Sequence, residues 1–261
     1  MKSIGQLKDE ALDALHGNFG KAALATLGLY AIVIGLNVIY KLMGGVSIVD
    51  YYKAQFMGDS SFLLDSIKGN AAVSIIQILV SILFLTPLTV GIFNTFRLLF
   101  ESKGAENNIF SNFFKLAFGK KYGHIVLVSF LSALLIGLLI LPGSIVAILL
   151  IVLAHSVPAL SWLFAIALIV YMFWLALMYS QINFIMLDNP ELDTIDVMRR
   201  SRELMNGNKW RFLGLLLSFI GWILLCIVTL GIGALWLDPY IHTTRSAFYC
   251  EIRDAQKPAE A

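Results

Sequence analysis

Long apolar runs separated by short polar segments dominate the pattern of this chain. Between Tyr122 and Leu187 there is no Lys, Arg, Asp or Glu, and a soluble domain could not keep such a stretch hydrated. A helix of about 20 apolar residues crosses the roughly 30 Å hydrocarbon core of a bilayer. The pattern therefore predicts an all-α, polytopic helical membrane protein with about six transmembrane helices and additional amphipathic interfacial helices, in a single integral membrane domain covering residues 1–261. The predicted spans are residues 22–42, 71–100, 124–154, 159–187, 212–229 and 234–249.

Two prolines affect the expected helix boundaries. Pro87 lies within the second run and is expected to remove one helical hydrogen bond and kink the helix. Pro142 and Gly143 interrupt the third run, so residues 124–154 form either one long kinked helix or two shorter ones. Residues 155–158 are the next expected turn. The sixth run is the most polar, and whether residues 234–249 fully span the bilayer stays open.

Two segments have the periodicity of amphipathic helices at a membrane surface. Residues 1–21 carry Ser3 and Gln6 at the spacing of a capping box, followed by apolar residues on one helical face. Residues 188–211 form a predicted cytoplasmic basic helix with one apolar face. Phenylalanines at helical spacing between residues 110 and 118 indicate a third interfacial segment.

A Gly-Asn pair precedes three of the predicted spans, at residues 17–18, 69–70 and 207–208. Glycine is expected to stop the preceding helix in a left-handed conformation, and asparagine to cap the helix that enters the membrane. The recurrence reflects either an internal duplication or shared local chemistry.

Composition excludes several classes of protein. Residues are 59% hydrophobic and only 14% charged, where globular domains carry about 25% charged residues. The net charge of +2 is too small to indicate nucleic-acid binding.

Cys226 and Cys250 lie in apolar context without a CxxC motif and are interpreted as small hydrophobic residues. Residues 1–21 lack the apolar region of a cleavable signal peptide, so the first span is expected to act as an uncleaved insertion signal.

The distribution of lysine and arginine predicts the topology. Residues 101–121 and 188–211 are rich in basic residues, whereas the turn at 155–158 has none and residues 43–70 balance Lys against Asp. Basic loops stay on the cytoplasmic side. With about six spans, both termini are therefore expected in the cytoplasm.

Asp238, His242 and Arg245 recur on one face of the sixth predicted span and are a candidate polar intramembrane site. Asp238 could take a proton or a cation there, and Arg245 an anionic headgroup. The alternative, which we favour, places Asp238 near one membrane interface while Arg245 extends to the other.

A basic cluster beside the fifth span is a candidate contact for anionic lipid headgroups, because such clusters attract anionic membrane surfaces. Its members are Arg199, Arg200, Arg202, Lys209 and Arg211. The cluster also serves as a topology signal, and both roles are compatible. Arg97, at the far end of the second run, is interpreted as a cytoplasmic-end anchor.

No catalytic constellation is recognisable. The four histidines are scattered without metal-ligand spacing, and HExxH, GxSxG and P-loop motifs are absent. We therefore expect a non-enzymatic protein with no cofactor and no metal.

Several short motifs resemble those of a bacterial multi-pass membrane family, domain-of-unknown-function family nine-seven-five. They are DNPE at 188–191, SRELMNGNKW at 201–210, LSFIGW at 217–222, LGIG at 230–233 and Pro239-Tyr240, with Pro87-Leu88, Gly91 and Leu141-Pro142-Gly143 earlier in the chain. Unlike the family's usual spacing, a long apolar stretch separates Pro142-Gly143 from Asp188. The resemblance implies a helical protein of the bacterial cytoplasmic (inner) membrane and brings no established activity.

Two functions are consistent with these features. The first is a non-enzymatic structural or regulatory protein that associates with anionic lipid or a membrane partner. The alternative is a transporter of a small solute or lipid with a polar site around Asp238, since broken helices often frame substrate sites. The sequence does not identify a protein partner or an oligomeric state.

Overall fold

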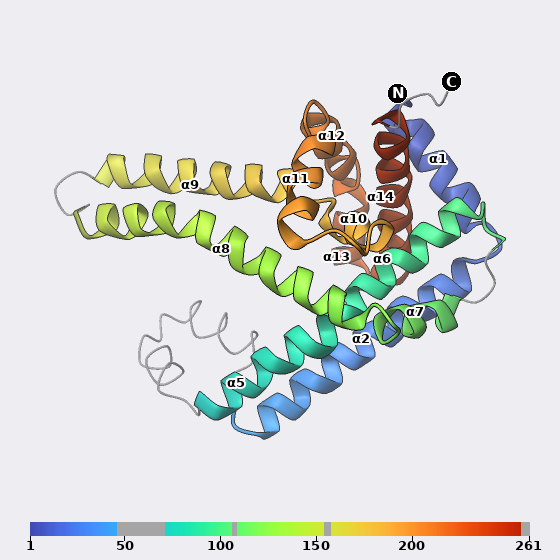
Figure 1. Cartoon of the computed structure of the whole chain (residues 1–261), viewed down its shortest axis with the longest axis horizontal. Coiled ribbons are helices and arrows are strands. Elements are labelled where there is room, and N and C mark those ends of the chain that lie inside the picture. The colour runs from blue at the N-terminus through green and yellow to red at the C-terminus, as the bar shows by residue number, and fades with distance from the viewer. Residues whose placement is uncertain (46–70, 106–108, 154–157, 257–261) are drawn as a thin grey trace.

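The computed structural model describes residues 1–45, 71–105, 109–153 and 158–256, and every regular element among them is helical (Figure 1). The elements are α1 (Ile4–Leu15), α2 (Phe19–Leu42), α5 (Ala71–Val80), a π-helical turn η1 (Ser81–Leu85), α6 (Thr86–Glu101), α7 (Ile109–Ala117), α8 (Tyr122–Leu153), α9 (Pro158–Met178), α10 (Ile182–Asp188), α11 (Thr194–Leu204), α12 (Lys209–Leu217), α13 (Ile220–Val228) and α14 (Ala234–Gln256). The predicted all-α fold is confirmed.

Five helical segments in the described part of the chain are long and apolar enough to cross a membrane. They are Phe19–Leu42, Ala72–Glu101, Tyr122–Val146, Ile166–Asp188 and Lys209–Val228, and each overlaps one of the first five predicted spans. The sixth predicted span, 234–249, falls in α14, which is not among these candidates. Asp238, Arg245 and Glu251 interrupt its apolar sequence.

The N-terminal amphipathic helix begins as predicted. Ser3 Oγ accepts a hydrogen bond from the Gln6 backbone N–H at 3.2 Å, and Gln6 Oε1 accepts one from the Ser3 backbone N–H at 2.8 Å. This reciprocal capping box satisfies two backbone donors at the start of α1. The apolar face that includes Leu7, Ala11 and Leu15 is buried, with α1 packed against α14.

In the two described Gly-Asn pairs, the glycine has the predicted conformation but the asparagine does not make the predicted cap. Gly17 and Gly207 both have φ of +78°, which confirms the left-handed helix stop. The predicted asparagine caps are wrong, because neither Asn18 nor Asn208 makes a side-chain cap hydrogen bond. Both residues have helical rather than extended backbone geometry, so their side-chain oxygens do not accept from the first free N–H groups of the helix. Asn18 Nδ2 donates to the Gly104 carbonyl at 2.7 Å and Asn208 Nδ2 to the Leu204 carbonyl at 2.9 Å. The third pair, residues 69–70, lies outside the described residues.

Pro87 and Pro142 act differently. Pro87 lies in the first turn of α6, where its missing N–H costs little. The chain before it widens into η1, and the Thr86 hydroxyl donates to the Ser81 carbonyl at 3.0 Å. Pro142 lies inside α8, which nevertheless continues as one helix from Tyr122 to Leu153. This decides between the two alternatives for residues 124–154.

The predicted fourth span, 159–187, is two helices rather than one. α9 ends at Met178 and α10 begins at Ile182. Between them Gln181 is fully buried, and its side-chain NH₂ donates to Ser180 Oγ at 2.9 Å. The Ser201 hydroxyl of α11 donates to the Met178 carbonyl at 3.0 Å, which satisfies a group that the end of α9 would leave unpaired. The expected turn at 155–158 lies outside the described residues, except that Pro158 begins α9.

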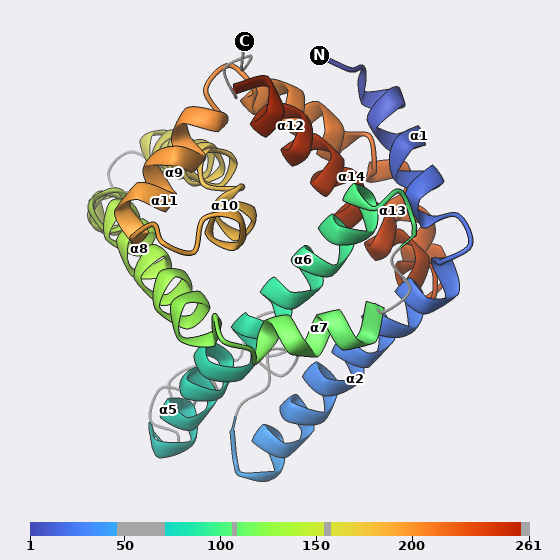
Figure 2. The ribbon, with the colours of Figure 1, turned by 45° about the vertical axis from the view of Figure 1, so that its right-hand side comes forward.

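α6 lies at the centre of the packing, in contact with α1, α7, α10 and α14 (Figure 2). Its Phe93 ring meets the edge of Phe184 of α10 at 5.5 Å, and Phe184 stacks on Tyr249 of α14 at 4.8 Å. Burying an aromatic side chain of this kind contributes about 1.5–3 kcal/mol. One hydrophobic core thus joins elements from both ends of the chain, from Leu7 to Ile252.

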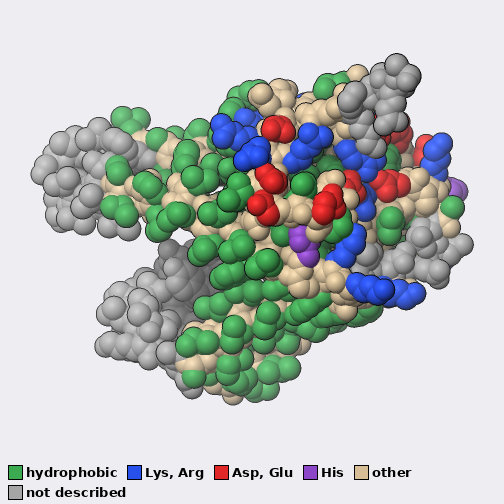
Figure 3. Space-filling view, in the orientation of Figure 1, with side chains coloured by type: hydrophobic (Ala, Val, Ile, Leu, Met, Phe, Trp, Pro, Cys, Tyr) green, Lys and Arg blue, Asp and Glu red, His purple; other side chains and the backbone are tan. Residues whose placement is uncertain are grey.

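Charged side chains gather at one end of the molecule. In Figure 3 they lie over α11, α14 and the nearby helix ends, whereas the coloured parts of α8 and α9 and of α2 and α5 carry mostly apolar side chains on this face. Exposed apolar residues are unusual at this density in a soluble protein but ordinary against lipid. The charged end therefore faces water or headgroups.

Candidate functional site

Four charged side chains form a partly buried ion-pair network where α6, α10 and the last turns of α14 meet. Arg97, only 8% exposed, pairs with Asp188. Asp188 also pairs with Arg253 at 3.1 Å, and Arg253 pairs with Glu101 at 2.8 Å. A buried charge is tolerated only when it is paired and hydrogen-bonded. The network therefore fixes three helix ends relative to one another.

Tyr249 and Cys250 of α14 complete this network. The Tyr249 hydroxyl donates to Asp188 Oδ2 at 2.6 Å. Burial raises the pKa of Tyr249 to about 12, against the lowering effect of Arg253 and Arg97, so the phenol keeps the proton it donates. The Cys250 thiol lies 3.6 Å from Glu101 Oε1, and burial raises the pKa of Cys250 to about 12. A thiol held protonated does not suit nucleophilic chemistry.

A second set of contacts ties the N-terminus to α12 and α14. Arg211 of α12 pairs with Glu251 of α14 at 2.5 Å and also donates to the Lys2 carbonyl. The Lys2 backbone N–H donates to Glu251, and its ammonium pairs with Glu10 at 2.6 Å. The start of the chain and the end of α14 therefore lie together at the charged end, as Figure 1 shows.

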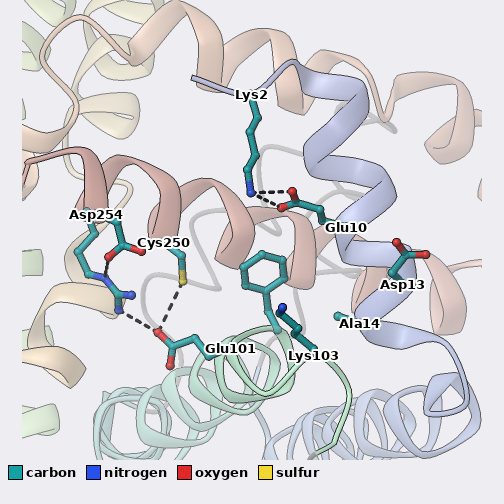
Figure 4. A pocket seen from close by; sticks show the side chains of 10 residues that line it. Lys2, Glu10, Asp13, Ala14, Glu101, Lys103, Cys250 and Asp254 are labelled. Atoms are coloured by element: carbon teal, nitrogen blue, oxygen red, sulfur yellow. Dashed lines mark hydrogen bonds and ion pairs between the residues drawn. The ribbon is translucent and has the colours of Figure 1, made fainter.

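A cavity of about 600 Å³ opens beside these contacts (Figure 4). Its lining comprises Lys2, Glu10, Asp13, Ala14, Phe100, Glu101, Lys103, Cys250, Arg253 and Asp254. Figure 4 shows Lys2 turned toward Glu10, and Glu101 turned toward Cys250. Because cations and carboxylates alternate around the wall and several pair with each other, the cavity favours neither an anion nor a cation. It is an open hollow with a wall of mixed charge at the charged end.

The predicted polar site on α14 is brought together only in part. His242 packs against the rings of Phe93 and Phe96, at 4.8 and 5.7 Å between ring centroids. The Arg245 guanidinium lies 4.8 Å from the centre of the Phe93 ring. Asp238 is partly exposed, and it is not among the residues that line the charged cavity, the cavity between α2 and α5, or the apolar groove beside α13. His242 and Arg245 therefore lie against the same ring, that of Phe93.

The predicted basic cluster divides into two parts. Arg199, Arg200 and Arg202 are exposed on α11, the first paired with Asp196 at 2.7 Å and the second with Glu203 at 3.7 Å. Lys209 places its ammonium 4.3 Å from the centre of the Trp174 ring, beside the exposed Trp210. Arg211 turns inward to Glu251, so the prediction that it belongs to the same lipid-facing surface finds no support in its position.

Sequence reasoning missed most of the ion-pair network. Arg97 is interpreted from the sequence as an anchor, but its partner Asp188, and Arg253 that pairs with the same carboxylate, are far from it along the chain. The usable signal was Arg97 itself, because an arginine within an apolar run requires a nearby counter-charge. Among the described residues, no group of three or more His, Cys, Asp or Glu side chains is arranged to hold a metal ion.

These helices and their charged end define a multi-pass α-helical membrane protein. The chain belongs to the family described as "Protein of unknown function (DUF975)", whose match covers residues 1–256. The resemblance noted in the sequence is thereby confirmed. Comparison with curated proteins and with solved structures gave no match.

Proposed function

We propose that this is a non-enzymatic protein of the bacterial cytoplasmic membrane that associates with anionic lipid headgroups through the basic surface of α11 and the start of α12. This surface, called the α11 surface below, consists of Arg199, Arg200, Arg202, Lys209 and the two tryptophans Trp174 and Trp210. Its proposed role is structural or regulatory, and no cofactor is required.

The observation that carries the proposal is that Lys209 lies beside exposed indole rings and closely follows the exposed arginines of α11, between two candidate spans. The span ending at Asp188 and the span beginning at Lys209 flank α11. Trp210 is 72% exposed, and its ring centroid lies 6.3 Å from that of Trp174. Tryptophan is enriched where a membrane meets water, and each nearby basic residue adds about 1 kcal/mol of attraction to an anionic surface.

The ion pairs on α11 do not cancel this attraction. Both link exposed residues three positions apart, and such surface pairs contribute about 0–1 kcal/mol. Arg202 is also exposed, and no ion partner for it lies in the described part of the chain. The arginines can therefore turn toward phosphate oxygens at small cost.

The proposed topology places both termini and the α11 surface in the cytoplasm, with α14 bringing the chain back across the membrane after the fifth candidate span. It is supported by the contacts among Lys2, Arg211 and Glu251, which bring the start of the chain and the end of α14 to the same end of the molecule. The basic segments 101–121 and 188–211 then share that side, as basic loops do in cytoplasmic membranes.

The transport alternative has less support. It needs Asp238 to face a water-filled path, and the neighbouring His242 and Arg245 pack against phenylalanine rings instead. We therefore keep association with anionic lipid as the proposed function.

The test uses the full chain with Trp210 as its only tryptophan and the other four replaced by Phe. Quenching of Trp210 fluorescence by brominated phosphatidylglycerol and by brominated phosphatidylcholine reports the preference for anionic lipid at this surface. The triple variant R199Q/R200Q/R202Q should lower that preference by about fivefold or more, since about 1 kcal/mol for each basic residue is about fivefold.

A matched control is K41Q/K53Q/K68Q, which removes the same charge from the side that the sequence predicts to be opposite. It should leave the preference at Trp210 unchanged. An equal preference for both lipids in the unmodified chain, or an equal loss in both triple variants, would overturn the proposed function.

A further inference from the structure

An apolar groove of about 590 Å³ lies where α1 and the start of α2 meet α13 and α14. Its lining includes Leu12, Trp222, Leu225, Cys226, Trp236 and Tyr240. Trp222 and Trp236 are each 51% exposed, so the groove is open to its surroundings along one side. Its volume lies within the usual range of about 300–1,000 Å³ for sites that bind small molecules.

A lysine lies beside this groove, close to Tyr240 of its lining. Lys8 lies one helical turn before Leu12 on α1, and its ammonium is 4.4 Å from the centre of the Phe219 ring and 5.7 Å from that of Tyr240, which also lines the groove. The ammonium donates to the carbonyl and hydroxyl of Ser218, both at 3.3 Å. Ser218 is the residue where α12 ends before α13 begins, so a break in the helix positions the cation.

Lys8 has no carboxylate within ion-pair distance among the described residues. Partial burial lowers the pKa of Lys8, and the exposed Asp9 next to it in the sequence only partly offsets this effect. A partly desolvated ammonium gains from an added anion, because an opposite charge favours its protonated form. The groove therefore has apolar walls, and the partly desolvated ammonium of Lys8 lies beside them.

We propose that this groove binds one anionic phospholipid, with its acyl chains along Trp222, Leu225 and Trp236 and its phosphate beside the Lys8 ammonium. The site is separate from the α11 surface and does not depend on the function proposed for it. Arginine and tryptophan define that surface, whereas Lys8 and the walls of α13 and α14 define this groove.

Two observations favour a phospholipid over a protein segment as the occupant. The walls are continuous with the candidate spans Phe19–Leu42 and Lys209–Val228, so the open side of the groove faces the bilayer. The polar end offers a cation held by a hydroxyl, a carbonyl and two ring faces, which complements a phosphate rather than an apolar helix.

The experiment uses the full chain in detergent, with Trp162, Trp174 and Trp210 replaced by Phe so that only Trp222 and Trp236 report. Titration with brominated phosphatidylglycerol and brominated phosphatidylcholine gives the association constant of each lipid at the groove. We expect phosphatidylglycerol to bind more tightly than phosphatidylcholine. Lys8→Gln should reduce the ratio of their association constants about fivefold. Lys120→Gln removes one exposed lysine elsewhere and should leave the advantage unchanged.

A second measurement needs no substitution at Lys8. Cys226 lines the groove, whereas Cys250 is buried, so a maleimide added to the folded protein should modify Cys226. The attached group should fill part of the groove and lower phosphatidylglycerol binding. The proposal is overturned if the two lipids bind equally, if Lys8→Gln and Lys120→Gln behave alike, or if alkylated Cys226 leaves the quenching unchanged. Loss of preference at Trp210 alone would refute only the function proposed for the α11 surface.

Discussion

Replacing Asp188 with Asn should cost this protein about 3 kcal/mol of stability. Asn keeps the shape of the side chain and an oxygen that can accept from Tyr249, so the change removes mainly the negative charge. Arg97 then loses its ion partner while its side chain is only 9% exposed. Removing one partner of a buried ion pair costs about 3–5 kcal/mol.

The lower end of that range applies here for a structural reason. Arg97 keeps a hydrogen bond to Asn94 Oδ1 at 2.8 Å, and Arg253 keeps its ion pair with Glu101 at 2.8 Å. Arg97 is therefore the one buried cation of this network that loses its ion partner. Asp196→Asn is the matched control, because its ion pair with Arg199 links side chains that are 44% and 64% exposed and contributes about 0–1 kcal/mol.

The assay is reversible unfolding of the detergent-solubilised chain in increasing mole fractions of dodecyl sulfate, followed by circular dichroism. A double-mutant cycle with Arg97→Met isolates the coupling between the two side chains. We expect the double variant to be less destabilised than the sum of the two single variants. A loss below about 0.5 kcal/mol for Asp188→Asn, or strictly additive effects, would refute the claim that the buried ion pair holds these helix ends together.

Three further predictions concern single residues. Tyr249→Phe should cost about 1.5–3 kcal/mol in the same assay, since a hydrogen bond to a charged group is lost while the ring packing remains. Gly207→Ala should cost about 1–2 kcal/mol because its φ of +78° is unfavourable for alanine, whereas Gly20→Ala, inside α2 with open space around it, should be neutral or stabilising. Since the pKa of Cys250 is raised to about 12, its alkylation in the folded protein should stay slow at pH 8, and mass spectrometry should find Cys226 modified first.

Local patterns in the sequence predicted local structure well. The capping box of Ser3 and Gln6 and the left-handed Gly17 and Gly207 depend on residues close in the chain, so their spacing was sufficient. The lengths of five apolar runs likewise predicted five candidate spans. The asparagine caps failed because the backbone of Asn18 and Asn208 is helical, a detail that residue type does not determine.

The charged end depends on contacts between distant parts of the chain. Arg211 and Glu251 belong to different helices, as do Arg97 and Asp188, and helical periodicity carries no information about such pairs. The sequence therefore groups Arg211 with the nearby Arg199 and Arg200, although its side chain pairs with Glu251 of α14. The break at Gln181 is not predicted for a similar reason: the Ser201 hydroxyl, which accepts from the Gln181 backbone N–H and donates to the Met178 carbonyl, belongs to α11.

The central claim is that most of this chain lies in a bilayer with its charged end in the cytoplasm. The direct test is accessibility labelling of single cysteines in intact cells, in a background where Cys226 and Cys250 are replaced by Ala. We expect Ala105→Cys and Glu191→Cys to react only after the membrane is permeabilised, and Gln55→Cys to react from outside without permeabilisation. Labelling of Gln55→Cys and Glu191→Cys from the same side would contradict the proposed topology, and a chain that stays monodisperse in buffer without detergent would contradict its place in the membrane.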